Sequence, residues 1–436
     1  MKHPRRLFAG VAALILAGTS GLVAVRLGQG GSTAGSSAVA VKATATPGQL
    51  TDGQKAARKT AVDAALAKRS AAVLNGDLKG FLASVDPKQP QLLSRQRMLF
   101  TNLRKFEFTS LKYFVADERP SPVLTSKYGA TVFSTRVMMR YQLTGLDVDP
   151  VQTDLGYAFV QRGGSWVLVE DSAIEESLSP DGHRQPWDFQ EIAVIRRGKV
   201  VVVVDNGEQA LGQKIAKVSK GAVDGVRRHW KRPWNGAVMV VAMSEPRVMA
   251  TLWTAGTGQG WTIAAKAVSL YDGEPWTQKS VPPVSSRIVV NPAVRTKLEQ
   301  DLLVHEMTHA ATLQLGVRTP IWLVEGIAEY VRCATIEDDP QWTVDPYRKT
   351  VRSKYLPSMK VLPRSAEFDV AGDRSYGQSW WITEYLVDEL GEKGVTALYT
   401  DLARQNTSQA AYTRILKQHT GKTPAQLVAA VKKFKG

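Results

Sequence analysis

The chain has 436 residues, 44% of them hydrophobic, which is enough for two packed domains after terminal segments are set aside. Its single cysteine, Cys333, excludes an intramolecular disulfide, and we expect a small buried side chain there rather than a nucleophile. The formal net charge is +16, but no nucleic-acid-reading module accompanies it, so no nucleic acid partner is expected.

The start of the chain is predicted to lie outside the folded domains. Residues 1–30 have a basic beginning followed by the uncharged, largely apolar run Leu7–Val25, which fits a signal peptide or a membrane anchor. Both alternatives stay open, since small residues at Ala38–Ala40 offer a cleavage site. Residues 31–51 are rich in Gly, Ser, Ala and Thr and read as a flexible linker. We therefore expect an extracytoplasmic protein, either membrane-anchored or secreted.

Residues 52–180 are predicted to form one α+β domain. Asp52–Leu74 has helical spacing of its apolar residues, and shorter helices follow it. Four strands come next, at Phe106–Val115, Gly129–Leu143, Asp154–Arg162 and Ser165–Glu170. The last two flank a Gly-Gly pair and predict a hairpin. Helices followed by a curved antiparallel sheet resemble the NTF2-like fold, which implies a cone-shaped accessory domain or, alternatively, a second ligand-binding site.

Residues 181–190 are a predicted connector, and residues 191–436 a second domain with its own small sheet. Val200–Val204 is a continuous β-branched run, which is typical of a buried strand. A hairpin-like pair of strands is predicted over Glu191–Val204, and further strands at Ala237–Met243, Ile263–Ala267 and Arg287–Val290. One helix is predicted over Gln209–Trp230. Asn291-Pro292 ends the last strand and leads into a helix.

That helix carries the most informative stretch, His305-Glu306-Met307-Thr308-His309. Two histidines four apart on a helix project from the same face, so one metal ion can bind both imidazoles. Zinc is the usual ion for two His and a carboxylate with one position left open. Glu306 lies beside them, where it can reach a water at that position. The plain alternative is an unrelated helix in which the two histidines cap or pack.

A second helix is predicted from Ile321, after a turn at Thr319-Pro320. Glu325 lies early on this helix and can reach back to the metal as a third ligand. Glu329, four residues later on the same face, can accept the free ring N–H of His305 or His309, a bond that fixes the tautomer of a metal-binding imidazole. Gly326 removes a side chain where these two helices are expected to approach closely.

The HEMTH motif followed by Trp322–Tyr330 resembles the gluzincin zinc metallopeptidases, especially the peptidase-MA-like group of bacterial envelopes. The resemblance implies that His305, His309 and Glu325 are zinc ligands and that Glu306 is the catalytic base. The metzincin pattern does not fit, because Thr312 and Leu315 stand where it requires a glycine and a third histidine. The interval from His309 to Glu325 is shorter than in some gluzincins.

The remainder of the chain is predicted to be mainly helical. The expected helices run from about 376 to Leu390, and over Val395–Ala403, Ser408–Gln418 and Thr423–Phe434. Tyr376 begins a Tyr-Gly-Gln-Ser segment that resembles one in the family, where a phenol opposite the zinc stabilises the oxyanion. The resemblance implies this role for Tyr376, with a structural role as the alternative, and His419 is a further candidate.

The expected fold class is α+β: an NTF2-like cone followed by a zincin-like domain with a small sheet, the HExxH helix and a helical C-terminal part. The expected function is an exported or membrane-anchored zinc peptidase with Glu306 as general base. Its substrate would be a peptide or protein. An endopeptidase is favoured, because no Gly-Ala-Met-Glu-Asn-type stretch for gripping an N-terminal amine is present. The alternative is a non-catalytic, zinc-bearing envelope scaffold that binds peptides, although the retained Glu306 argues against it.

Basic residues are spread along the chain, with clusters at Arg95–Lys105, Arg196–Lys199, Arg227–Arg232 and Lys432–Lys435. In an exported protein they favour attraction to an anionic membrane or cell-wall surface. The plain alternative is a generic solvated basic surface. The sequence leaves the oligomeric state open.

Overall fold

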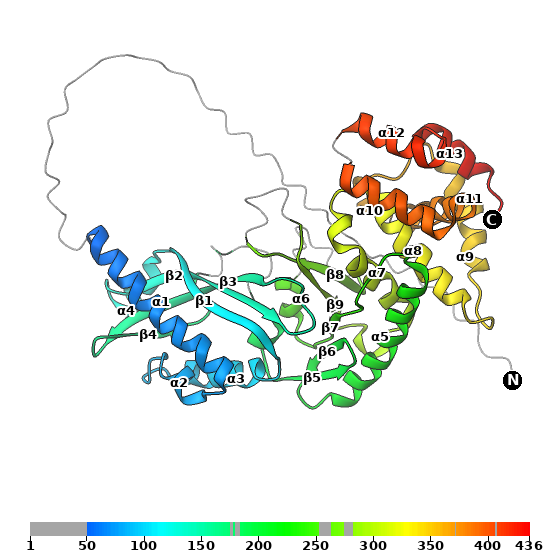
Figure 1. Cartoon of the computed structure of the whole chain (residues 1–436). Coiled ribbons are helices and arrows are strands. Elements are labelled where there is room, and N and C mark those ends of the chain that lie inside the picture. The colour runs from blue at the N-terminus through cyan, green and yellow to red at the C-terminus, as the bar shows by residue number, and fades with distance from the viewer. Residues whose placement is uncertain are drawn as a thin grey trace, which may run out of the picture.

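A computed structural model describes residues 50–174, 178, 184–252, 263–273, 282–370, 372–405 and 408–436. The expected leader, nearly all of the expected linker and part of the connector at 181–190 lie outside the described residues. The protein is α+β, as predicted, with two sheets and many helices (Figure 1). Within the described residues, no helix is both long and apolar enough to cross a membrane.

The N-terminal unit is a four-stranded antiparallel sheet with helices against it (Figure 1). Its helices are α1 (Asp52–Asn75), α2 (Leu78–Leu82), α3 (Pro90–Leu103) and α4 (Pro122–Tyr128). Its strands are β1 (Phe108–Glu118), β2 (Phe133–Leu143), β3 (Val151–Arg162) and β4 (Ser165–Glu170), in the order β1-β2-β3-β4. The predicted β3–β4 hairpin is present, since Gly163 and Gly164 supply the positive φ that its tight turn needs.

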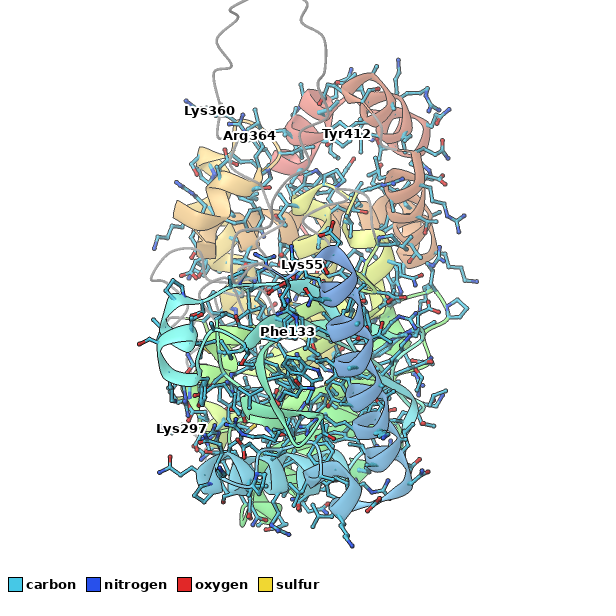
Figure 2. The ribbon with its side chains drawn as sticks, turned by 90° about the vertical axis from the view of Figure 1, so that its left-hand side faces the viewer. Lys55, Phe133, Lys297, Lys360, Arg364 and Tyr412 are labelled. Carbon is cyan, nitrogen blue, oxygen red and sulfur yellow. The ribbon has the colours of Figure 1, made fainter. Side chains whose placement is uncertain are left out.

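Helix α1 covers the outer strand of this sheet. The side chains of Ser70 and Asp63 accept the backbone N–H groups of Tyr113 and Val115 at 3.0 and 2.7 Å, which satisfies donors on the edge of β1. Figure 2 shows α1 passing in front of the sheet, with Phe133 of β2 close to it. β2 begins four residues later than predicted, because the turn that follows α4 at Gly129 occupies the start of that segment.

The second sheet is mixed and lies in the middle of the molecule (Figure 1). Its strands are β5 (Ile192–Arg197), β6 (Val200–Asp205), β7 (Val238–Val241), β8 (Ala265–Leu270) and β9 (Ser285–Val290), in the order β5-β6-β7-β9-β8. β6, β7 and β9 are parallel, whereas β5 and β8 run antiparallel at the two edges. α5 (Gln209–His229) connects β6 to β7, and α6 (Pro246–Leu252) follows β7.

The C-terminal part is helical, as predicted, and covers one side of the second sheet (Figure 1). Its elements are η4 (Arg295–Lys297), α7 (Gln300–Gly316), α8 (Ile321–Glu337), α9 (Asp345–Thr350), η5 (Val351–Tyr355), η6 (Leu356–Ser358), α10 (Ser365–Val370), α11 (Gly372–Gln405), α12 (Gln409–Thr420) and α13 (Pro424–Lys433). Gly391, with a φ of 68°, interrupts α11 where the sequence predicted a helix end.

Both faces of the second sheet are buried, which explains its continuous apolar strands. On one face, Val202 and Val240 belong to a core with α5, α7, α8 and α11. On the other face, Val203 and Val241 belong to a core with the sheet and helices of the N-terminal unit. Trp187, in the expected connector, is 1% exposed within this second core. The two predicted domains therefore share a core.

A buried ion pair joins the same two units. Asp147, in the turn between β2 and β3, lies 2.8 Å from Arg287 of β9, and both side chains are at most 1% exposed. Ser285 donates to Asp147 at 2.6 Å, so the carboxylate is well satisfied. The pair fixes the N-terminal unit against the strand that leads into α7.

Candidate metal and catalytic centre

Helix α7 holds the HEMTH motif inside the protein. It is apolar around most of its circumference, which suits a helix covered on all sides. Asp301 in its first turn accepts the backbone N–H of Leu302 at 2.8 Å and places a negative charge at the positive end of the helix. His305, Glu306 and His309 are each at most 5% exposed.

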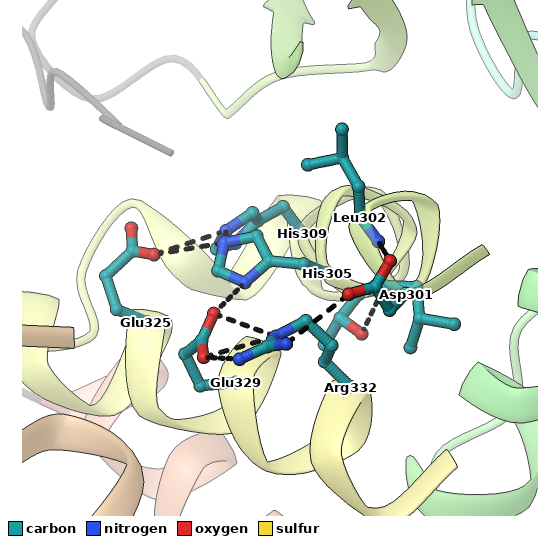
Figure 3. Close-up of polar contacts among 9 residues, drawn as sticks. Asp301, Leu302, His305, His309, Glu325, Glu329 and Arg332 are labelled. Carbon is teal, nitrogen blue, oxygen red and sulfur yellow. Dashed lines mark hydrogen bonds and ion pairs between the residues drawn. The ribbon is translucent and has the colours of Figure 1, made fainter. Parts of the chain in front are cut away.

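Three ligand atoms converge between α7 and α8 (Figure 3). The Nε2 atoms of His305 and His309 are 3.0 Å apart. Oε2 of Glu325 lies 3.4 Å from the first and 3.5 Å from the second. A tetrahedral zinc ion with bonds of about 2.0–2.2 Å separates its ligands by about 3.3–3.6 Å. No other group of three metal-ligating side chains occurs among the described residues.

Glu325 gives an independent test of whether a cation fits. Its side chain is fully buried, and neither carboxylate oxygen makes a hydrogen bond within the described part of the chain. Burial opposes ionisation, yet the two imidazoles hold the pKa of Glu325 below its usual range. A buried carboxylate without donors is costly, and a cation between it and the imidazoles removes that cost. The donor set therefore fits a divalent metal ion.

Glu329 contacts His305, one of the three candidate metal ligands, on the side away from Glu325. Its Oε1 lies 2.8 Å from Nδ1 of His305, which leaves Nε2 of that ring for a metal (Figure 3). Burial opposes protonation of His305, but Glu325 and Glu329 raise its pKa to about 10. The sequence left open which histidine Glu329 would contact, and the structure places it against His305.

Arg332 and Asp301 extend this contact, and sequence reasoning did not identify either of them. Arg332 donates to Glu329 at 2.6 Å, and its other nitrogen lies 3.5 Å from Asp301 at the start of α7 (Figure 3). Burial opposes ionisation of Glu329, yet Arg332 and His305 lower its pKa to about 2. The i, i+3 spacing of Glu329 and Arg332 was the one available signal.

Glu306 lies between the metal ligands and the edge of the second sheet. Its Oε2 accepts the backbone N–H of Ala267, in β8, at 2.7 Å. Its Oε1 makes no hydrogen bond among the described residues. Burial raises the pKa of Glu306, while the two imidazoles act in the opposite direction. The carboxylate is thus held by one oxygen and has the other available.

Tyr376, near the start of α11, is also brought to this centre. Its ring centroid lies 6.1 Å from that of His305, and its ring packs edge-on against Phe368. It is 3% exposed. His419, the other candidate, is instead paired with Asp401 at 2.8 Å.

The expected role of Gly326 is wrong. A side chain at this position would meet the backbone oxygen and hydroxyl of Ser379 and Thr383 in α11, at 2.6 and 2.4 Å. The glycine therefore lets α8 approach α11, and not α7. Cys333, by contrast, is fully buried as predicted, and burial raises the pKa of its thiol.

Comparison with known proteins agrees with this geometry. Residues 285–422 match a family model described as the Peptidase MA superfamily. This span begins at β9 and ends just after α12, so it contains the converging ligands, Glu306 and Tyr376. A search of curated proteins found no match. The chain therefore carries a peptidase MA superfamily domain around its candidate metal centre.

Proposed function

We propose that this protein is a zinc-dependent peptidase of the gluzincin type that hydrolyses peptide bonds in peptide or protein substrates. The observation that carries the proposal is the convergence of His305, His309 and a fully buried Glu325 with no hydrogen bond of its own. Two imidazoles and one carboxylate form the ligand set of zinc sites that keep a position open for chemistry.

Zinc bound at these side chains would polarise a peptide carbonyl and lower the pKa of a coordinated water. Glu306 would accept a proton from the attacking water and pass it to the leaving amine. The burial that raises the pKa of Glu306 suits a carboxyl group that has to take up and release a proton in one cycle. Tyr376 would donate a hydrogen bond to the oxyanion that develops on the substrate.

β8 is our candidate for the strand that pairs with an extended substrate. It is an edge strand, and its Ala267 N–H already contacts the Glu306 carboxylate. A peptide laid along this edge would place a scissile bond beside Glu306 and the metal ligands. Pairing along a strand requires no free substrate terminus, which favours endopeptidase activity.

We also propose that the protein acts outside the cytoplasm, either anchored by residues 1–30 or released after their removal. The basic start and the apolar run Leu7–Val25 support this. Residues 52–180 would serve as an NTF2-like accessory domain, which is supported by helices lying against a four-stranded antiparallel sheet.

The test is metal content and peptide turnover of the purified full chain, measured in parallel. We expect about one zinc per chain in the wild type and in Glu306→Gln, and loss of zinc in His305→Ala and Glu325→Ala. Turnover should fall by a factor of about 10²–10⁴ in Glu306→Gln. Wild-type turnover in Glu306→Gln would overturn the base assignment. Zinc binding without cleavage across a broad peptide panel would support the scaffold alternative.

A further inference from the structure

A pocket lies in the C-terminal helical part, and none of its lining residues belongs to the candidate metal centre. It has a volume of about 430 Å³ and is formed by the end of α13 together with η5 and η6. Four of its lining residues are basic, namely Arg352, Lys432, Lys433 and Lys435. No acidic side chain lines it.

The four cations lack acidic partners. None of them forms an ion pair with Asp or Glu in the described part of the chain. Lys432 is held by the backbone oxygens of Pro357 and Met359, which it contacts at 3.3 and 3.2 Å, so its ammonium group is positioned at the pocket. Like charges gathered around one cavity repel each other and create a local positive potential, which a bound anion neutralises.

The floor of the pocket is apolar and firmly packed. Leu356 is 5% exposed, and Phe434 packs against Trp381 and Tyr385 of α11 at centroid distances of 5.3 and 5.5 Å. α11 also packs on α8, so the floor rests on the main core. The basic side chains therefore surround a hollow whose apolar side is held by packing on α11.

We propose that this pocket binds a phosphate group, free or carried on an ester such as a phospholipid head group. A phosphate group has three or four oxygens that can accept from several cations at once, and lysine is a common point-charge partner for it. The apolar floor formed by Leu356, Pro357 and Phe434 suits the carbon atoms that adjoin the phosphate in an ester. This site is independent of the proposed peptidase chemistry.

The test compares two triple variants of the full chain that lose the same charge. Arg352→Gln/Lys433→Gln/Lys435→Gln removes pocket cations. Lys68→Gln/Lys79→Gln/Lys88→Gln removes three exposed cations of the N-terminal unit. Inorganic phosphate is titrated into each by calorimetry at constant ionic strength. We expect saturable binding that is at least tenfold weaker in the pocket variant and within twofold of wild type in the control.

A vesicle arm identifies the source of the phosphate. Co-flotation of each protein is compared between phosphatidylglycerol and phosphatidylcholine vesicles. The pocket variant is compared with the control variant and the wild type, because all three share any vesicle binding by residues 1–30. A phosphatidylglycerol-dependent gain lost in the pocket variant alone assigns the site to lipid head groups. Binding of inorganic phosphate without that gain assigns it to a free phosphate. Equal weakening in both triple variants, or no saturable binding of either probe, overturns the proposal.

Two further readouts protect the test against misfolding. In wild-type protein, bound phosphate should shield Lys432, Lys433 and Lys435 from acetylation, as measured by mass spectrometry, while Lys68, Lys79 and Lys88 stay reactive. Turnover of a soluble peptide should be unchanged in the pocket variant, because none of its residues touches the metal centre. If Lys432, Lys433 and Lys435 are acetylated equally with and without phosphate, the site is contradicted as strongly as by failed calorimetry.

Discussion

Arg332 donates to Glu329 at 2.6 Å, and Glu329 in turn contacts His305, one of the three candidate metal ligands. An ionised Glu329 can only accept, so the ring of His305 carries a proton on Nδ1, and Nε2 is the ring atom that could bind a metal ion. Since Arg332 also reaches Asp301, one guanidinium links the first turn of α7 to the middle of α8.

Arg332→Met should therefore weaken zinc binding by a factor of about 10–100 and destabilise the fold by about 3–5 kcal/mol, because it leaves Glu329 charged and buried. Competition with a zinc chelator and chemical denaturation measure the two effects. Arg332→Lys should restore part of the zinc affinity. Arg364→Met is the matched control, since Arg364 forms an exposed pair with Glu367 and its loss should cost less than 1 kcal/mol, on the order of other surface pairs.

The Glu329 carboxylate should make stability depend on pH. Its folded-state pKa of about 2 lies below the unfolded value, so its contribution is present above about pH 4.3 and is lost as the pH falls towards 2. That difference corresponds to about 3 kcal/mol at neutral pH. Glu329→Gln should therefore be much less stable than wild type at pH 7, with about half of the gap gone at pH 3. Urea denaturation across this range measures it, and a gap independent of pH would contradict the assignment.

Tyr376→Phe separates an oxyanion role from a packing role. The ring contacts with His305 and Phe368 remain possible in the variant, so its stability and zinc content should stay close to wild type. Loss of the hydroxyl should lower kcat by a factor of about 10² if it stabilises the oxyanion. Steady-state kinetics on one peptide decide the matter, and an unchanged kcat would leave Tyr376 a purely structural residue.

Asp147→Ala should lower the free energy of unfolding of both units, which should unfold in one transition. It leaves the fully buried Arg287 without its partner, which costs about 3–5 kcal/mol. Replacing both members, as in Asp147→Leu/Arg287→Met, should recover most of that loss, because an apolar pair avoids the cost of burying charge. Asp272→Asn is a useful comparison, since its pair with Arg140 also joins the units but is partly exposed. Two separate unfolding transitions in wild type would argue against coupling.

The parts of the centre that follow from local geometry could be predicted from the sequence. His305 and His309 share a helix face because of the helical period, and Glu325 and Glu329 follow the same rule on α8. Contacts made across long sequence separations could not be predicted in this way. The Ala267–Glu306 hydrogen bond joins residues 39 apart, and the Asp301–Arg332 contact depends on how α7 and α8 cross.

For the fold, too, local features could be predicted from the sequence, whereas long-range pairings could not. Most strands of both sheets were expected close to their observed positions, because alternating or continuous apolar runs are local signals. The strand order β7-β9-β8 carries no such signal, since it depends on which edges pair after collapse. The role of Gly326 was misassigned for a similar reason: a glycine indicates close approach, but not which helix approaches.

The second sheet has two cores, and alternate residues of one strand belong to different ones. Val240 faces the helices that carry the candidate metal centre, and its neighbour Val241 faces the N-terminal unit. A substitution that shifts one of them moves the other through a single peptide bond. The packing of the N-terminal unit and the packing around the candidate metal centre are therefore coupled through this strand. A core substitution between Val62 and Leu168 can therefore alter the backbone next to the candidate metal centre.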